Sequence, residues 1–315
     1  MPPATGEAHR GLMITVEHLT KRYGQFTAVD DVSFVCESGT ITGFLGPNGA
    51  GKSTTLRMVT ALTPPTAGRV LIDGTAYRDL PNPGRTVGVM LDASAQHPGR
   101  SGAEILRLTA TMLGLPASCV ADMLERVGLA GSGKRLVGNY SLGMRQRLGI
   151  GAALLGDPSI LILDEPANGM DPEGIRWMRH LLRDFADRGG TVLLSSHLLG
   201  EVQATVDRLV VIGNGRVVAD GQLADLLASQ GTVVRGLDPA GLAAAMSTAG
   251  LEFHPLDNGA LRVQGDAEQV GRAAAHAQQI LLELREHDSS GLEELFFELT
   301  TPDSTPDSTP EAVAA

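Results

Sequence analysis

The segment Gly-Pro-Asn-Gly-Ala-Gly-Lys-Ser-Thr, from Gly46 to Thr54, constrains the fold of this chain more than any other feature. It directly follows Ile41–Leu45, an apolar run with the length of a buried strand. Gly46, Gly49 and Gly51 let the backbone wind closely enough for its N–H groups to surround a phosphate. We expect a helix from Thr54 onward, whose positive N-terminal end would face the same anion. The order of strand, loop and helix therefore predicts a P-loop that binds nucleotide phosphates.

The polar residues of this loop have the chemistry that a triphosphate needs. Lys52 is expected to bridge the β- and γ-phosphates, and the hydroxyl of Ser53 is expected to contact Mg²⁺. A glycine-rich turn that fits the pattern by chance is the alternative, and the flanking strand and helix disfavour it. The predicted nucleotide-binding residues of the loop are Gly46, Asn48, Gly49, Gly51, Lys52, Ser53 and Thr54.

Composition limits the other functions that the chain could have. Its 315 residues, 43% of them hydrophobic, suffice for one large and one small globular domain. A net charge of −11 without any basic run argues against nucleic acid as the main partner. No stretch is apolar enough to cross a bilayer and residues 1–11 lack the layout of a signal peptide, so a cytosolic location is expected. Cys36 and Cys119 are too few for a disulfide framework or a zinc site, and both are predicted to be small buried residues.

Hydrophobic patterns predict an α/β fold over residues 12–228. Residues 92–150 have the helical spacing of Leu, Met and Ala that is typical of a helical subdomain. Strands separated by helices, as expected after this subdomain, are typical of a parallel sheet with crossover helices. We therefore predict a P-loop NTPase core with an antiparallel β subdomain and a helical subdomain. The predicted strands, besides the P-loop strand, are 12–20, 29–34, 69–73, 160–163, 191–195 and 209–212.

Residues 229–300 are predicted to form a separate C-terminal accessory domain. Strand and helix signals follow one another there in the order β-α-β-β-α-β, which is that of a ferredoxin-like unit. A last helix, capped by Ser290, is expected to end in an apolar Leu-Phe-Phe segment at 295–297. Residues 1–11 are expected to be flexible, and residues 301–315, which repeat Thr-Pro-Asp-Ser, to be disordered.

Two carboxylates stand at the exit of another predicted strand. The apolar run Ile160–Leu163 leads directly into Asp164 and Glu165. Asp164 is expected to hold Mg²⁺, and Glu165 to polarise the water that attacks the γ-phosphate. An acidic pair at a strand end is by itself more often a solvated turn. The P-loop upstream makes the catalytic interpretation the stronger one here.

With these residues in place, the sequence resembles the nucleotide-binding subunits of ATP-binding cassette (ABC) transporters. Tyr23 looks like the aromatic residue that stacks on adenine, although an isolated Tyr is usually structural. Ser141 and Gly143, in Tyr-Ser-Leu-Gly-Met, resemble the family signature at the start of a helix. Asp171 closes a segment that resembles the loop signalling across the dimer, and His197 resembles the histidine that contacts the γ-phosphate. The motifs occur in the order that the family has.

The resemblance covers about residues 12–225 and implies a mechanism. It implies ATP and Mg²⁺ as cofactors, with Glu165, His197, Lys52 and Asp92 in catalysis and Ser53, Asp164 and Asp92 at the metal. It also implies a head-to-tail homodimer in which the P-loop of one copy faces the signature of the other across ATP. Closing and opening of the dimer would drive a separately encoded transmembrane permease from the cytoplasmic side of the cell membrane.

The chain departs from the family's pattern at the signature and at one strand end. Asp92 stands where the family usually has Gln, and its carboxylate could still ligate Mg²⁺. Gln96 is a possible, less well placed substitute for that Gln. Leu142 and Met144 replace the usual Gly and Gln of the signature.

The segments around residues 91–100 and 141–147 look most like the ATPases of bacterial ABC-2 type drug and antibiotic exporters, in the daunorubicin-resistance group. Two other functions remain open, a soluble ABC ATPase that acts on ribosomes or DNA and an importer ATPase. A single cassette, with an interval from Lys52 to Ser141 too short for a long coiled coil, disfavours the former. The C-terminal domain is expected to stabilise a dimer or to bind a regulatory small molecule.

Overall fold

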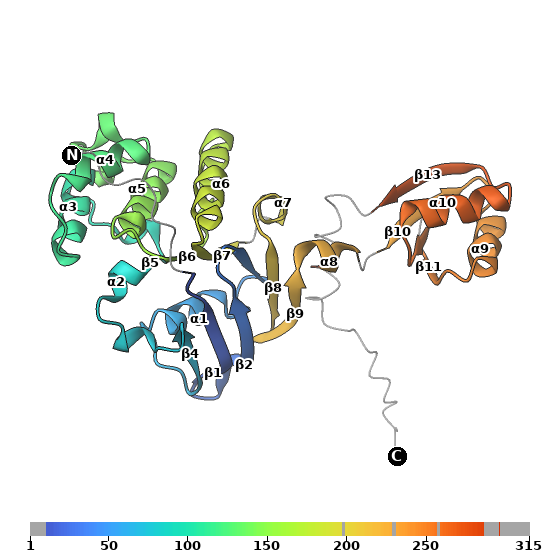
Figure 1. Ribbon diagram of the computed structural model, residues 1–315, viewed down its shortest axis with the longest axis horizontal. Helices are drawn as coiled ribbons and strands as arrows, with labels where there is room; N and C mark the ends of the chain where they lie inside the picture. The colour runs from blue at the N-terminus through green and yellow to red at the C-terminus, as the bar shows by residue number, and fades with distance from the viewer. Residues whose placement is uncertain (1–10, 197–198, 229–230, 257–258, 287–295, 297–315) are drawn as a thin grey trace, which may run out of the picture.

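In the computed structural model, which describes residues 11–196, 199–228, 231–256, 259–286 and 296, a six-stranded sheet forms the centre of the larger domain (Figure 1). Its order is β5-β6-β7-β3-β8-β9, and every neighbouring pair is parallel except β8 and β9. The strands at its centre are buried along their length, as apolar runs in a parallel sheet should be. Their bounds are β3 Ile41–Leu45, β5 Val87–Met90, β6 Ile160–Leu163, β7 Thr191–Ser196, β8 Arg208–Gly213 and β9 Arg216–Gln222.

A second, antiparallel sheet has the order β2-β1-β4, with β1 Ile14–Tyr23, β2 Phe26–Cys36 and β4 Ala67–Ile72. Its inner face shares a hydrophobic core with the larger sheet. The rings of Phe34 on β2 and Phe44 on β3 lie with their centroids 5.3 Å apart, within the range of favourable aromatic pairs. This packing places the turn between β1 and β2 in the same region as the loop after β3.

The helices α3 Gly102–Met112, α4 Cys119–Arg126 and α5 Leu142–Leu154 form the predicted helical subdomain and gather at one side of the molecule (Figure 1). α3 begins with a full capping box between Ser101 and Glu104, whose side chains satisfy each other's backbone N–H groups. The other helices of this domain are α1 Lys52–Val59, α2 Pro83–Thr86, α6 Pro172–Asp187, α7 Leu199–Gln203 and α8 Leu223–Ala228. None of the helices among the described residues combines the length and apolar character needed to cross a bilayer.

The C-terminal domain has the predicted ferredoxin-like topology, because its four antiparallel strands are ordered β11-β12-β10-β13 with two helices between them. Val234, Met246 and Val270, each fully buried, lie in its separate core. Asp266 caps α10 by accepting a hydrogen bond from the N–H of Gln269. The bounds are β10 Thr232–Gly236, α9 Pro239–Thr248, β11 Phe253–Pro255, β12 Leu261–Val263, α10 Ala267–His276 and β13 Leu281–Glu286.

Several predictions concern residues that the structure does not describe. These are the flexibility of most of residues 1–11, the disorder of 301–315 and most of the last helix after Ser290. Phe296 is described, and it packs against the hydrophobic core of the larger domain. Cys36 is buried as predicted, and burial raises the pKa of its thiol to about 12. Cys119 is partly exposed, so the prediction that it is buried is wrong.

Candidate functional site

The P-loop is shaped by glycines that no other residue could replace without strain or collision. Gly49 and Gly51 have φ of 85° and 105°, in the region that favours glycine. A Cβ atom at Gly46 would lie 2.4 Å from the carbonyl oxygen of Ile212 on β8. The conformation of the loop between β3 and α1 therefore depends on glycine at these three positions.

The start of α1 is suited to an anion. Its N-terminus has no side-chain cap and no acidic residue in the first turn, so its backbone N–H groups are not engaged by a capping side chain. Lys52 is buried, and its Nζ donates hydrogen bonds to the carbonyl oxygens of Gly46 at 2.6 Å and Pro47 at 3.2 Å. Burial lowers the pKa of Lys52, and the carboxylates of Glu165 and Asp164 oppose this shift. The Lys52 ammonium, held beside the uncapped N–H groups of α1, is therefore suited to bind a polyphosphate.

One cavity of about 470 Å³ brings together residues from three separate parts of the sequence. Tyr23 and Phe26 from the turn between β1 and β2 line one part of it, and Glu165 after β6 lines another. These two aromatic residues are 52% and 63% exposed, so a flat ring of a ligand can reach them. Lys21 lies with its Nζ 5.1 Å from the centre of the Tyr23 ring. The P-loop residues that line the cavity are Asn48, Gly49, Gly51, Lys52, Ser53 and Thr54.

Phe26 was not among the predicted site residues. It pairs directly with Tyr23 at the end of the β1–β2 ladder, so the two aromatic side chains lie at the same turn. The sequence carried a signal for it, because two aromatic residues flank a Gly-Gln dipeptide at a hairpin turn.

The acidic pair is held by neighbouring elements. Asp164 and Glu165 are both partly buried, immediately after the buried strand β6. The hydroxyl of Ser195 on β7 donates a hydrogen bond to Asp164 Oδ1 and accepts one of 3.0 Å from the N–H of Glu165. Gln146 on α5 donates through Nε2 to the carbonyl oxygens of Glu165 and Asn168, both at 3.2 Å. Neither Ser195 nor Gln146 was predicted, because both act through tertiary contacts.

The signature residues lie outside the P-loop cavity. Ser141 is the N-cap of α5 and accepts a hydrogen bond of 3.2 Å from the N–H of Met144. Gly143 lies so close to the loop after β6 that a Cβ would be 3.3 Å from the Gly169 carbonyl oxygen. Asp171 caps α6 by accepting a hydrogen bond of 2.7 Å from the N–H of Gly174. The structure of one chain therefore does not bring Ser141, Gly143 or Asp171 to the residues around Lys52.

Asp92 also has a local partner. Its carboxylate accepts hydrogen bonds from the N–H and the hydroxyl of Ser94, at 2.7 and 2.6 Å, and these bonds lower the pKa of Asp92. It does not line the P-loop cavity. Gln96, the possible substitute, donates its amide to the carbonyl oxygen of Arg145 at 3.2 Å. His197 lies outside the described residues.

The residues around the P-loop fit Mg²⁺ delivered with a nucleotide better than a resident metal. Within the part of the chain that the structure describes, no three His, Cys, Asp or Glu side chains are grouped to hold a metal ion. Mg²⁺ characteristically binds through one or two protein oxygens together with substrate phosphates and water. Ser53, exposed in the cavity, and Asp164, bonded to Ser195, supply such oxygens.

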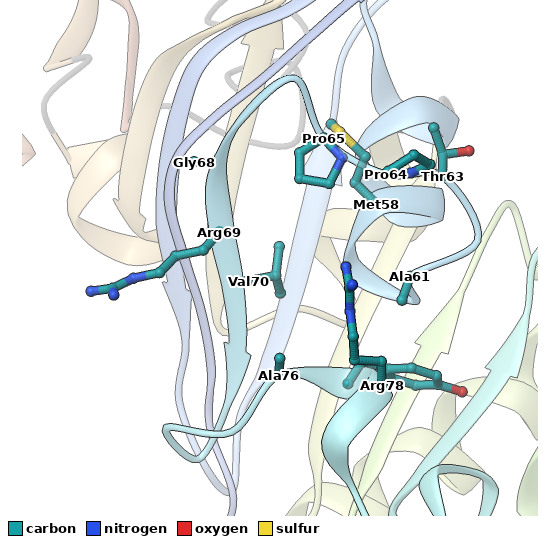
Figure 2. A pocket seen from close by; sticks show the side chains of 11 residues that line it. Met58, Ala61, Thr63, Pro64, Pro65, Gly68, Arg69, Val70, Ala76 and Arg78 are labelled. Atoms are coloured by element: carbon teal, nitrogen blue, oxygen red, sulfur yellow. The ribbon is translucent and has the colours of Figure 1, made fainter.

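A second cavity of about 460 Å³ lies between the end of α1, β4 and the turn Tyr77–Asp79. Figure 2 shows that Arg69 points away from the other labelled side chains, and it pairs with Glu17 at 2.6 Å. No predicted site residue lines this cavity.

Comparison with known families agrees with the geometry of the P-loop cavity. A family profile described as ABC transporter matches residues 29–168. A profile described as a domain of unknown function matches residues 230–293, which include all the strands of the C-terminal domain.

The chain is similar to ATP-binding proteins of several transport systems. The bacitracin transport ATP-binding protein BcrA of Bacillus licheniformis is 40% identical over 211 residues, which cover 66% of this chain and 69% of that protein. The lantibiotic transport ATP-binding protein SrtF of Streptococcus pyogenes is 36% identical over 210 residues, covering 66% and 90%. The linearmycin resistance ATP-binding protein LnrL of Bacillus subtilis is 32% identical over 308 residues, covering 91% and 98%.

Solved structures show the same fold. A structure described as the ATP-binding subunit of an ABC transporter superposes with a TM-score of 0.63 at 30% identity, covering 68% of this chain and 91% of that one. An ATP-binding cassette solved as a dimer with ADP and phosphate gives a TM-score of 0.61 at 22% identity, covering 67% and 98%.

Proposed function

The chain belongs to the ATP-binding subunits of ABC transporters, and on this premise we propose that it powers export of an antibiotic or drug through a separately encoded membrane permease. As a member of this family it binds and hydrolyses ATP. The observation that carries the proposal is the cavity in which Tyr23, the P-loop and Glu165 meet. Its two aromatic rings, uncapped helix and carboxylate correspond to the base, the phosphates and the scissile end of ATP.

Binding of ATP is proposed to use three groups of this cavity. Tyr23 stacks on the adenine, and Phe26 lies beside it. The N–H groups of the P-loop and of the first turn of α1 surround the phosphates. Lys52 exchanges its hydrogen bonds to the Gly46 and Pro47 carbonyls for the β- and γ-phosphates, so its charge is already in place before the nucleotide arrives.

Hydrolysis is proposed to depend on Glu165. It lines the same cavity as the P-loop residues and would accept a proton from the attacking water. Ser53 and Asp164 would hold Mg²⁺, which neutralises charge that develops on the phosphate oxygens. His197 and Asp92 are proposed to assist at the γ-phosphate and the metal, with Asp92 first exchanging its bonds to Ser94.

The separation of the signature from the cavity supports a homodimer. Ser141 caps α5 and Gly143 lies in its first turn, within the helical subdomain, and neither lines the cavity that holds Lys52. A second copy, placed head to tail, would bring its signature to the exposed side of the P-loop and enclose ATP between the two chains. Asp171, exposed beside Gly143, would lie at the same interface. ATP-driven closure is then the step that moves the permease.

The direction of transport and the location are inferred from relatives. BcrA and SrtF are named as transport proteins for bacitracin and a lantibiotic, and LnrL as a resistance protein for linearmycin. We therefore propose an exporter ATPase bound to the cytoplasmic side of the cell membrane. These relatives favour neither an importer nor an ATPase that acts on ribosomes or DNA.

The test uses the variant Glu165→Gln, tagged and purified from solubilised membranes of the native host with ATP and Mg²⁺. The amide keeps the size of the carboxylate without its basicity, so the variant should bind ATP, stay dimeric and lose turnover by about 10²–10⁴-fold. A polytopic membrane protein at matching stoichiometry is expected with it. Recovery of ribosomes, of DNA or of the variant alone would contradict the export proposal.

A further inference from the structure

Ser195 occupies a buried position between the two carboxylate residues. It is fully buried near the end of β7, which runs parallel to β6, and the ladder pairs Leu163 with Leu194. Ser195 therefore falls level with the first residues that leave β6. A hydroxyl can donate one hydrogen bond and accept others, and this one donates to Asp164 Oδ1 while accepting the N–H of Glu165.

The backbone of Glu165 needs such support. Its φ is 49°, in the left-handed region that costs a residue with a side chain on the order of 1–3 kcal/mol. Ser195 accepts a hydrogen bond from its N–H, and Gln146 donates one to its carbonyl oxygen. These two bonds hold the Glu165 backbone, and with it the direction of the Cα–Cβ bond, at the edge of the cavity that Glu165 lines.

We propose that Ser195 is a positioning residue for ATP hydrolysis. It aims the Asp164 carboxylate at the metal and fixes the Glu165 peptide so that the base reaches the attacking water. Ser195 itself does not line the nucleotide cavity, so it acts through the two carboxylates. The inference rests on the proposed function, because it assigns Ser195 to the same reaction.

A purely structural role would give a different result. If the hydroxyl only satisfied buried polar groups, its loss would lower the free energy of unfolding by about 1–3 kcal/mol and leave turnover per folded molecule unchanged. A positioning role changes kcat and the dependence on Mg²⁺, because the orientation of a metal-binding carboxylate is set by its hydrogen-bond partner.

The experiment compares Ser195→Ala, Ser195→Thr and Ser196→Ala in the full chain. Ser196 is the next residue of β7, so its side chain points to the other face of the sheet and provides a matched buried control. Steady-state ATPase activity is measured over a range of ATP and Mg²⁺ concentrations, with ATP binding and melting temperature measured in parallel. If the alanine variant does not fold, Ser195→Cys, which fills similar space with a weak donor, tests the same bond.

We expect Ser195→Ala to lower kcat by about 10- to 100-fold, which is usual for loss of such an outer partner, and to raise the Mg²⁺ concentration for half-maximal rate. Its affinity for ATP should stay near that of the wild type. Ser195→Thr, which keeps the hydroxyl, should restore most of the rate, and Ser196→Ala should change kcat and the Mg²⁺ dependence much less than Ser195→Ala does. Wild-type kcat and Mg²⁺ dependence in Ser195→Ala, or equal losses in Ser195→Ala and Ser196→Ala, would overturn the role of Ser195. A wild-type protein without ATPase activity would instead overturn the proposed function itself.

Discussion

Replacing Lys52 by methionine tests the P-loop assignment most directly, because methionine keeps much of the apolar stem and removes the ammonium with its charge and its hydrogen-bond donors. In the protein without nucleotide, the ammonium donates to the carbonyl oxygens of Gly46 and Pro47. Gly46 is buried and Pro47 is exposed, so water can replace the lost bond at Pro47 but not at Gly46. One buried unsatisfied carbonyl lowers the free energy of unfolding by about 1–3 kcal/mol.

The loss of ATP binding should be larger than this loss of stability. A hydrogen bond to a charged group contributes about 1.5–3 kcal/mol, so removing two from the phosphates lowers the binding free energy by about 3 kcal/mol or more. This corresponds to a roughly 150-fold weaker affinity. At an ATP concentration of 100 times the wild-type Kd, the nucleotide raises the free energy of unfolding by about 2.7 kcal/mol in the wild type and by about 0.3 kcal/mol in the variant.

The assay is urea unfolding with and without ATP and Mg²⁺, with Lys134→Met as the control. Lys134 is exposed in the helical subdomain, so this control removes a lysine without touching the cavity. We expect the control to keep the full ATP-dependent increase in stability. If Lys52→Met kept an increase of about 2 kcal/mol or more at this ATP concentration, the ammonium would not contact the phosphates and our interpretation of the cavity would be wrong.

Two further predictions follow from packing and burial. Gly46→Ala places its Cβ against the Ile212 carbonyl, so it should lower the free energy of unfolding by about 1–3 kcal/mol in urea titrations. Gly131→Ala is the control and should have little effect, because its Cβ meets open space. Cys36, which is fully buried and whose pKa burial raises to about 12 from 9.0, should stay unreactive toward a thiol reagent at pH 8. Burial also raises the pKa of Cys119, but its side chain is partly exposed and should react faster. The pKa of Cys36 is higher in the folded protein than in the unfolded chain. Its protonated thiol therefore stabilises the folded state fully below pH 9, and this contribution is lost as the pH rises from 9 toward 12. Labelling of Cys36 as fast as Cys119 would contradict its burial.

The sequence predicted the strands that are buried on both faces better than those at an edge. β3 and β6 have the predicted bounds, because each is a short apolar run that ends at a functional turn. β9 was missed, since Arg216–Gln222 alternates exposed and partly buried residues and forms its ladder with β8 alone. An edge strand with few apolar residues is specified by its neighbour's backbone hydrogen bonds, and these leave little pattern in the sequence.

The candidate site likewise contains residues that could be predicted from the sequence and residues that could not. The P-loop residues could be predicted because their function depends on a local run of backbone and glycine geometry. Ser195 and Gln146 could not, because each contacts the acidic pair across 19 to 31 positions of sequence. Asp92 and Asp171 were predicted as site residues, but neither lines the P-loop cavity within one chain. Their carboxylates cap local backbone N–H groups in the structure of one chain, since short acidic side chains bond readily to the backbone two or three residues onward.

Gln146 connects the signature on α5, which lies outside the P-loop cavity, with the loop that carries Glu165, which lines that cavity. Ser141, the signature residue, is the N-cap of α5, and Gln146, five positions later, donates hydrogen bonds to the carbonyl oxygens of Glu165 and Asn168. Gly143 on the same helix approaches the Gly169 carbonyl oxygen of that loop. A helix is stiff over one and a half turns, so α5 cannot shift at Ser141 without moving its contacts to the loop. The position of the signature and the position of the proposed base are therefore mechanically linked within one chain, even though only the base lines the P-loop cavity.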